Sequence, residues 1–298
     1  MIKTYTSIPS VNENAILNVI IFAPNNEEDI KGMIQVCHGM TEHMDRYNKF
    51  AEYFTARGYV VFGNDIISHG KSICNKTFGL YLDNWFDAVN DVENVRKHVE
   101  KSYPGLPVYL LGFSLGSFIV RCMLDISDYE KEILIGTGNQ PGPMLSAMSK
   151  MIALKYGERV SMASDEIREL AFGNYNKHFE NEPENYWLLT DDKEREAYES
   201  DPLVTKEMTP KFFSEFLRGM AYASKQLKNP NNTIPTLFLY GRNDPVGDFG
   251  KGVRKVYKAY YKNNIDTEID YFEGTHDILH DGDVSNDVFE TILRYLEK

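Results

Sequence analysis

The segment Gly112-Phe113-Ser114-Leu115-Gly116 constrains the fold more than any other part of the chain. Residues 108–111 before it form an apolar and aromatic run that predicts a buried strand. Residues 117–124 after it predict a helix that is buried on most sides. A serine between two glycines at such a junction is the pattern of a nucleophile elbow, a tight turn that presents the hydroxyl at the carboxyl edge of a sheet. The alternative is an ordinary glycine-rich turn, because five residues can match by chance.

Short apolar runs alternate with longer helical segments along most of the chain. The continuous apolar runs are typical of parallel strands that are covered on both faces. Such alternation predicts an α/β fold with a mainly parallel sheet flanked by helices, and ligands then bind at the carboxyl ends of the strands. The predicted strands are 15–22, 33–37, 59–64, 108–113, 133–137, 236–240 and 267–272, and the predicted helices are 47–57, 84–101, 114–124, 250–262 and 284–297.

The alternation stops between residues 140 and 229, where we find no run typical of a buried strand. We therefore expect one domain over residues 1–298, with a helical insertion over 140–229 placed above the elbow as a cap. The insertion begins with a series of methionines, which suit either an adaptable apolar surface or plain core packing. Its acidic stretch, 180–201, is typical of a solvated face. The methionines are Met144, Met148, Met151 and Met162.

Composition excludes some classes of protein. The chain has 298 residues and a formal net charge of −12, which argues against a nucleic-acid partner because phosphate binding requires basic clusters. No window approaches the about 20 apolar residues that span a bilayer, and the first residues do not resemble a signal peptide. The three cysteines, Cys37, Cys74 and Cys122, lack metal-ligand spacing and are typical of reduced thiols. We expect a cytoplasmic protein without a metal or a cofactor.

A serine hydroxyl needs a base within hydrogen-bond reach, and the base needs an acid that orients it. In hydrolases with an elbow the chain order is serine, acid, histidine. His276 fits the base, because it follows the last predicted strand in a loop with Gly274. His280, four residues on, is interpreted as a neighbouring or surface residue. The other histidines precede Ser114 or lie in the insertion; they are His38, His43, His69, His98 and His178.

Asp244 is the predicted acid. It lies just past the strand at 236–240, in a turn that continues into a proline, and it precedes His276 by about one helix and one strand. Asp248 is the nearest competitor but lies farther from the strand end. Asp277 and Asp281 are less favoured, because a side-chain bridge between such close neighbours of His276 would be strained.

Ester cleavage through a serine also needs two N–H donors for the oxyanion of the tetrahedral intermediate. One is the backbone N–H of the residue after the nucleophile, here Leu115. The other comes from a loop after an early strand. His38-Gly39-Met40 follows the strand at 33–37, so we assign the second donor to the backbone of Met40.

With these residues in place, the chain resembles the α/β-hydrolase superfamily, and within it the group of monoacylglycerol lipases and lysophospholipases. The resemblance rests on the elbow, on the Asp244 and His276 loops, and on His38-Gly39-Met40-Thr41-Glu42-His43 followed by Arg46-Tyr47. It also rests on Asp65 with Ser68-His69-Gly70-Lys71-Ser72, where Ser68 replaces the usual glycine of the family. The resemblance implies an α/β-hydrolase fold, an apolar acyl pocket under a helical cap, and structural roles for His43 and His69.

The predicted function is that of a serine hydrolase that cleaves carboxylic esters, such as monoacylglycerols, lysophospholipids or similar acyl esters. One alternative keeps the fold and changes the reaction to that of a peptidase, a carbon–carbon bond hydrolase, a perhydrolase or an acyltransferase. A second is a ligand-binding protein without turnover. A third is a lipase whose cap contacts a lipid surface, which the methionines permit and the net charge disfavours.

Overall fold

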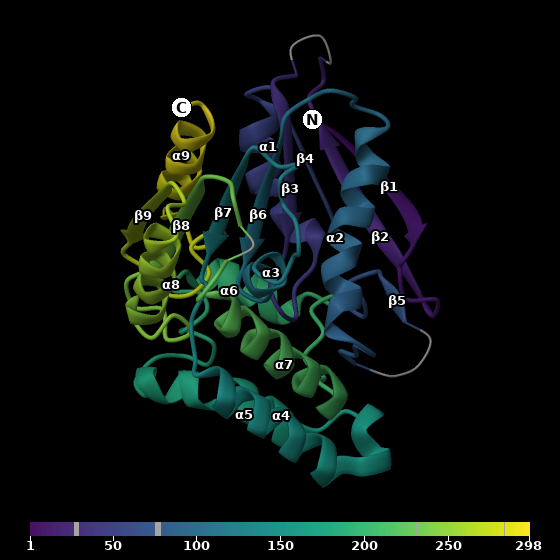
Figure 1. Cartoon of the computed structure of the whole chain (residues 1–298), viewed down its shortest axis with the longest axis vertical. Helices are drawn as coiled ribbons and strands as arrows, with labels where there is room; N and C mark the ends of the chain where they lie inside the picture. Colours follow the sequence, from purple (N-terminus) through teal and green to yellow (C-terminus); the bar gives the residue numbers. More distant parts are fainter. Residues whose placement is uncertain (27–29, 75–78, 231, 283) are drawn as a thin grey trace.

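The computed structural model describes residues 1–26, 30–74, 79–230, 232–282 and 284–298. Their strands form one sheet in the order β1-β2-β4-β3-β6-β7-β8-β9, with β5 paired to β2 (Figure 1). From β4 to β9 along this order neighbouring strands are parallel, whereas β2 pairs antiparallel with β1, β4 and β5. The predicted α/β fold is confirmed. The strands are β1 (Ile2–Pro9), β2 (Ala15–Ala23), β3 (Gly32–Cys37), β4 (Tyr59–Asn64), β5 (Ile73–Cys74), β6 (Val108–Phe113), β7 (Lys131–Ile135), β8 (Thr236–Gly241) and β9 (Thr267–Phe272).

Helices cover both faces of the sheet. On one face α1 (Asn48–Thr55) and α9 (Val284–Leu296) pack through Phe50, Phe54 and Phe289. On the other face lie α2 (Trp85–Glu100), α3 (Leu115–Val120) and α8 (Lys251–Lys262). Every residue of β3, β4, β6 and β8 is buried, as the continuous apolar runs predicted. This double cover fixes the strand ends from which the loops of the site emerge.

Several elements differ from the sequence-based expectation. Strand β1 was not predicted, because it is an edge strand whose residues are mostly exposed and polar, so it lacks an apolar run. The helix predicted over 114–124 is shorter, since α3 ends at Val120. The predicted helix over 47–57 begins as a 3-10 turn, Met44–Tyr47, and continues as α1.

In the described residues between β7 and β8 the regular elements are helices, and they lie beyond the carboxyl ends of the parallel strands (Figure 1). The main helices are α4 (Gly142–Tyr156), α5 (Asp165–Asn176), α6 (Asp192–Ser200) and α7 (Pro210–Gln226), with short 3-10 turns at Gly157–Ser161 and Lys177–Phe179. Helix α7 joins this insertion to the body, because Trp85 of α2 packs against Phe216. The division into one domain with a cap over 140–229 stays a prediction.

Candidate active site

The backbone at Ser114 is strained in the way an elbow requires. Ser114 lies between β6 and α3 with φ 50° and ψ −115°, and its N–H donates to Ile135 O at 2.9 Å. A positive φ in a residue other than glycine costs on the order of 1–3 kcal/mol, which the surrounding structure must offset. A Cβ on Gly116 would lie 1.9 Å from Cys37 O, and one on Gly112 would lie 2.9 Å from Gly116 O. Both glycines are therefore required by the close approach of α3 to β3 and β6.

The loops after β6, β8 and β9 bring together the three residues predicted as nucleophile, acid and base. His276 Nε2 lies 2.7 Å from Ser114 Oγ, and His276 Nδ1 lies 2.9 Å from Asp244 Oδ1. Asp244 is fully buried, whereas the competitor Asp248 is exposed and faces Lys251. The arrangement places a base against the hydroxyl and a carboxylate behind the base.

The surroundings of His276 favour its protonated form. Burial by itself lowers the pKa of His276, but the Asp244 carboxylate, with smaller contributions from Asp277 and Glu42, outweighs it and raises the pKa above 6.5. The rings of Phe113 and Trp187 flank the imidazole, with centroids 5.2 and 5.7 Å away. His276 can thus accept a proton from Ser114 and hold it next to Asp244.

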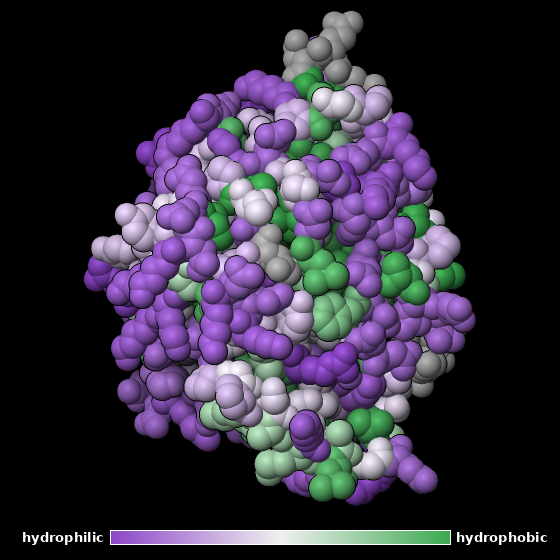
Figure 2. All heavy atoms as spheres, viewed as in Figure 1, coloured by the Kyte–Doolittle hydropathy of each residue, from purple (hydrophilic) through white to green (hydrophobic). Residues whose placement is uncertain are grey.

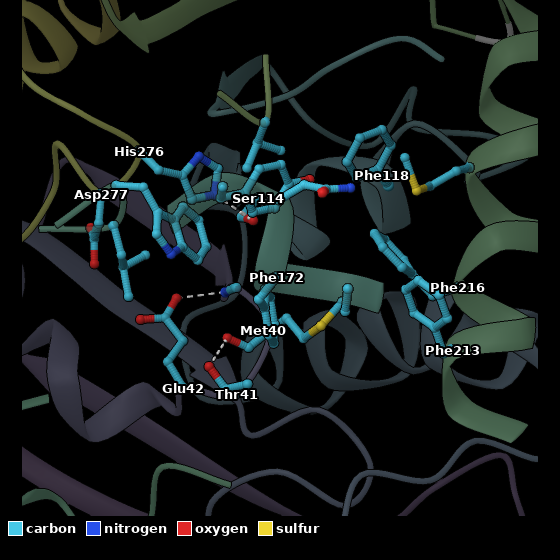
Figure 3. A pocket seen from close by; sticks show the side chains of 18 of the residues that line it. Met40, Thr41, Glu42, Ser114, Phe118, Phe172, Phe213, Phe216, His276 and Asp277 are labelled. Carbon is cyan, nitrogen blue, oxygen red and sulfur yellow. Dashed lines mark hydrogen bonds between the residues drawn. The ribbon is translucent and has the colours of Figure 1, made fainter. Parts of the chain in front are cut away.

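The loop predicted to supply an oxyanion donor borders the same cavity as Ser114 (Figure 3). Met40 follows β3, and Glu42 holds the loop by accepting the Gly39 N–H at 2.5 Å. In the part of the chain that the structure describes, the N–H groups of Met40 and Leu115 have no acceptor. Both are free to donate, and their assignment to the oxyanion remains a prediction.

Sequence reasoning missed a buried ionic cluster that joins this loop to the histidine loop. Arg46 Nη1 lies 2.5 Å from Glu42 Oε2, and Arg46 Nη2 lies 3.3 Å from Asp277 Oδ2. Asp277 Oδ1 contacts His280 Nδ1 at 2.8 Å, and Tyr47 donates to Glu42. His280 is therefore a buried neighbour of the site and not a surface residue. We call Glu42, Arg46, Asp277 and His280 the ionic cluster.

Glu42, Asp277 and His280 also bring three ligand atoms within 4.8 Å of one another, which is a spacing that a metal ion could use. The guanidinium of Arg46 already supplies the positive charge between the two carboxylates. Burial raises the pKa of Asp277, but His280 and Arg46 outweigh it and lower the pKa to about 2. The geometry fits a salt-bridged cluster better than a metal centre.

The remaining motif residues hold the loops in place. His69 is buried with Nδ1 3.1 Å from Ile67 O, and His43 Nε2 lies 2.9 Å from Asp201 Oδ2. Asp65 accepts the backbone N–H groups of Met44 and Lys71, each at 2.8 Å. The Asp65–Met44 bond joins the segments 38–47 and 65–72, and the His43–Asp201 contact joins the first of them to the insertion.

The cavity at Ser114 has an apolar side and a polar side. Figure 3 shows Phe118, Phe213 and Phe216 on one side of Ser114, and Glu42 and Asp277 on the other. The volume is about 340 Å³, within the about 300–1,000 Å³ range of small-molecule sites. The apolar Met144, Leu145, Met148, Leu217 and Met220 of the insertion and the polar Thr41, Arg46 and Tyr198 also line the cavity.

The fold and the elbow define an α/β-hydrolase. The chain belongs to the family described as "Serine aminopeptidase, S33", whose model matches residues 28–283. It is 27% identical to the monoglyceride lipase homolog of Monkeypox virus, over 90% of this chain and 88% of that protein. It is also 27% identical to the monoglyceride lipase of Homo sapiens, over 90% of this chain and 83% of that protein.

Among solved structures, the chain is similar to a thermostable carboxyl esterase from Bacillus coagulans, with a TM-score of 0.89 and 24% identity over 100% of this chain and 98% of that one. Family and relatives together identify a serine ester hydrolase. Within the residues that the structure describes, no helix is both long and apolar enough to cross a membrane.

Proposed function

We propose that this enzyme hydrolyses monoacylglycerols through Ser114, His276 and Asp244. The observation that carries the proposal is the position of Ser114 between the two sides of its cavity (Figure 3). An ester of an acyl chain with a small polyol has the same two parts, joined at the carbonyl that a serine attacks. The lipase relatives named above support this choice.

The charges on the polar side favour an uncharged alcohol. Two carboxylates and one guanidinium surround that side, so a phosphate-bearing head group would meet an excess of negative charge. Hydroxyl groups can bond to Thr41 and Tyr198, and the buried indole N–H of Trp187 has no acceptor in the described part of the chain. We therefore place monoacylglycerols ahead of lysophospholipids.

The family description raises the alternative of an aminopeptidase. Such an enzyme needs a carboxylate that is free to bind the α-ammonium group of a peptide. Glu42 is already paired with Arg46 and Tyr47, and Asp277 with Arg46 and His280. The cavity therefore has no unpaired carboxylate among these residues, which disfavours the peptide substrate.

In the proposed mechanism His276 Nε2 takes the proton from Ser114 Oγ while the oxygen bonds to the ester carbon. The N–H groups of Met40 and Leu115 stabilise the negative carbonyl oxygen. The intermediate collapses as His276 protonates the glyceryl oxygen, which breaks its bond to carbon and leaves an acyl-serine. Water then attacks the acyl carbon as His276 takes its proton, and His276 returns that proton to Ser114 Oγ as the acyl–Oγ bond breaks and the fatty acid leaves. Asp244 stabilises the imidazolium at each stage.

A panel of substrates with one acyl chain tests the proposal. We expect the highest kcat/KM for a monoacylglycerol, a lower value for the lysophosphatidylcholine, and little turnover of aminoacyl arylamides. Higher kcat/KM for an arylamide than for every ester would overturn the substrate assignment. If the protein hydrolyses none of these substrates but is labelled by a fluorophosphonate, its substrate is another acyl donor.

We also propose that the insertion contacts a lipid surface. Apolar side chains of α4, α5 and the turn between them are exposed, and Figure 2 shows hydrophobic spheres at this end of the molecule. Met144 and Leu170 are half-exposed and also line the cavity. A single-chain lipid could pass from the surface to Ser114 at this position.

The cytoplasmic location stays a proposal, consistent with the free thiols of Cys37 and Cys122.

A further inference from the structure

A second concave site lies on α8, formed by residues other than those that line the cavity at Ser114. Nine residues surround a groove of about 720 Å³, and six of them are basic. The basic residues are Lys228, Lys251, Arg254, Lys255, Lys258 and Lys262; the other three are Leu227, Ala259 and Asn263. The groove has no acidic lining residue, although the chain as a whole carries a net charge of −12. The proposed catalytic mechanism does not use any residue of this basic groove.

The sequence of α8 produces the groove directly. Val253, Val256 and Tyr260 are buried against the sheet. Cations recur at spacings of three and four residues from 251 to 262, so they share the opposite side of the helix. Lys228, which follows α7, closes the groove from the other side. Figure 2 shows a mainly hydrophilic surface where Figure 1 places α8.

The cations in the groove lack the partners that a structural role would give them. In the described ranges, Lys228, Lys255, Lys258 and Lys262 have no carboxylate within ion-pair distance. Lys251 lies 3.8 Å from the exposed Asp248, a contact that contributes little. Arg254 donates to Tyr240 O–H at 2.6 Å, which fixes its guanidinium at the groove without neutralising it. The groove thus concentrates uncompensated positive charge.

We propose that the basic groove binds a soluble small molecule that carries two or more linked phosphates. Several cations on a concave surface match adjacent phosphates, because lysine and arginine give charge-assisted hydrogen bonds to phosphate oxygens. The volume lies in the range of small-ligand sites, whereas a bilayer presents a flat surface to protruding side chains. The exposed apolar residues proposed to meet lipid lie on α4 and α5, not on α8.

Calorimetric titration of the full chain with inorganic tripolyphosphate and with ATP, at low ionic strength, tests this site. We expect saturable one-to-one binding with a Kd below about 1 mM, which weakens as salt is added. The variant Lys255→Gln/Lys258→Gln should raise the Kd at least about tenfold. The matched control, Lys101→Gln/Lys193→Gln, removes the same charge from exposed positions after α2 and on α6, and it should bind like the unmodified protein.

Flotation with phosphatidylserine vesicles separates the soluble ligand from a lipid head group. The proposal expects no difference in flotation between the groove variant and its control. Absence of saturable binding to both phosphates would overturn the proposal, as would equal affinities in the two variants. A flotation defect confined to the groove variant, without phosphate binding, would show that the groove contacts anionic membranes instead. Ester hydrolysis should be unchanged in both variants, so this test is independent of the proposed substrate.

Discussion

At the scale of single residues, the charge environment of His276 makes a prediction about pH. The base acts in its neutral form, and its pKa is raised above 6.5 because Asp244 outweighs burial. The acid limb of kcat/KM should therefore have a midpoint above 6.5, and activity should fall as pH decreases through it. Asp244→Asn should reduce kcat by about 10⁴-fold. A pH–rate profile with a midpoint below 6.5 would contradict this account of His276.

Ser68 gives a second prediction, which concerns stability. It has φ 65° where the family usually has glycine, and its hydroxyl donates to Tyr81 O at 2.9 Å and accepts the Tyr81 N–H at 2.7 Å. These two bonds offset the strain of the left-handed backbone. Ser68→Gly loses both hydrogen bonds and also the strain, so its free energy of unfolding should be nearly unchanged. Ser68→Ala keeps the strain and should cost about 1–2 kcal/mol of unfolding free energy, measured by urea denaturation. Equal losses of unfolding free energy in Ser68→Gly and Ser68→Ala would show that the hydrogen bonds do not offset the strain.

At the scale of elements, the ionic cluster positions two catalytic loops relative to each other. Arg46→Met removes the guanidinium that bridges the buried Glu42 and Asp277, so we expect a loss of about 3–5 kcal/mol of unfolding free energy. The kcat should also fall, since both loops lose a shared anchor. Arg46→Lys should have a stability and a kcat between those of the unmodified protein and those of Arg46→Met, because lysine cannot span both carboxylates with one planar group.

Arg168 on α5 provides the matched control for Arg46. Its pair with Asp165 is 3.5 Å long and exposed, so Arg168→Met should change stability by less than about 0.5 kcal/mol. Similar losses for Arg46→Met and Arg168→Met, measured by urea unfolding and by kcat on a p-nitrophenyl ester, would show that the cluster has no positioning role.

The comparison of sequence and structure also belongs to this scale. The buried strands could be predicted because each is a continuous apolar run, and Asp244 and His276 because loops at adjacent strand ends meet at one edge. The ionic cluster could not, since Arg46 and Asp277 are 231 positions apart and only the folded chain brings them together. The shape of the apolar side of the cavity could not be predicted either, because it depends on how side chains of α4 and α7 come together beside Phe118.

At the scale of the whole molecule, the net charge and the exposed apolar residues of the insertion have opposite effects on binding to anionic lipid. Met151 and Leu154 are 68% and 86% exposed, and burying each in lipid would gain about 1.5–3 kcal/mol. The net charge of −12 repels anionic head groups. We expect stronger flotation with phosphatidylcholine vesicles than with phosphatidylserine vesicles, and a difference that shrinks as salt screens the repulsion.

The variant Met151→Glu/Leu154→Glu should abolish flotation on phosphatidylcholine without lowering turnover of a water-soluble ester. Lys101→Gln/Lys193→Gln, with its exposed changes away from α4, serves as the control. Undiminished flotation of the Met151→Glu/Leu154→Glu variant would exclude this surface as the lipid contact.

Whole-molecule labelling tests the central claim, that acyl transfer proceeds through Ser114. The protein is titrated with a fluorophosphonate, and intact mass, the modified peptide and monoacylglycerol hydrolysis are followed together. We predict one adduct per chain, located on Ser114, with activity lost in proportion to labelling, and neither labelling nor turnover in Ser114→Ala. An adduct on another residue, or undiminished hydrolysis by the fully labelled protein, would contradict the account.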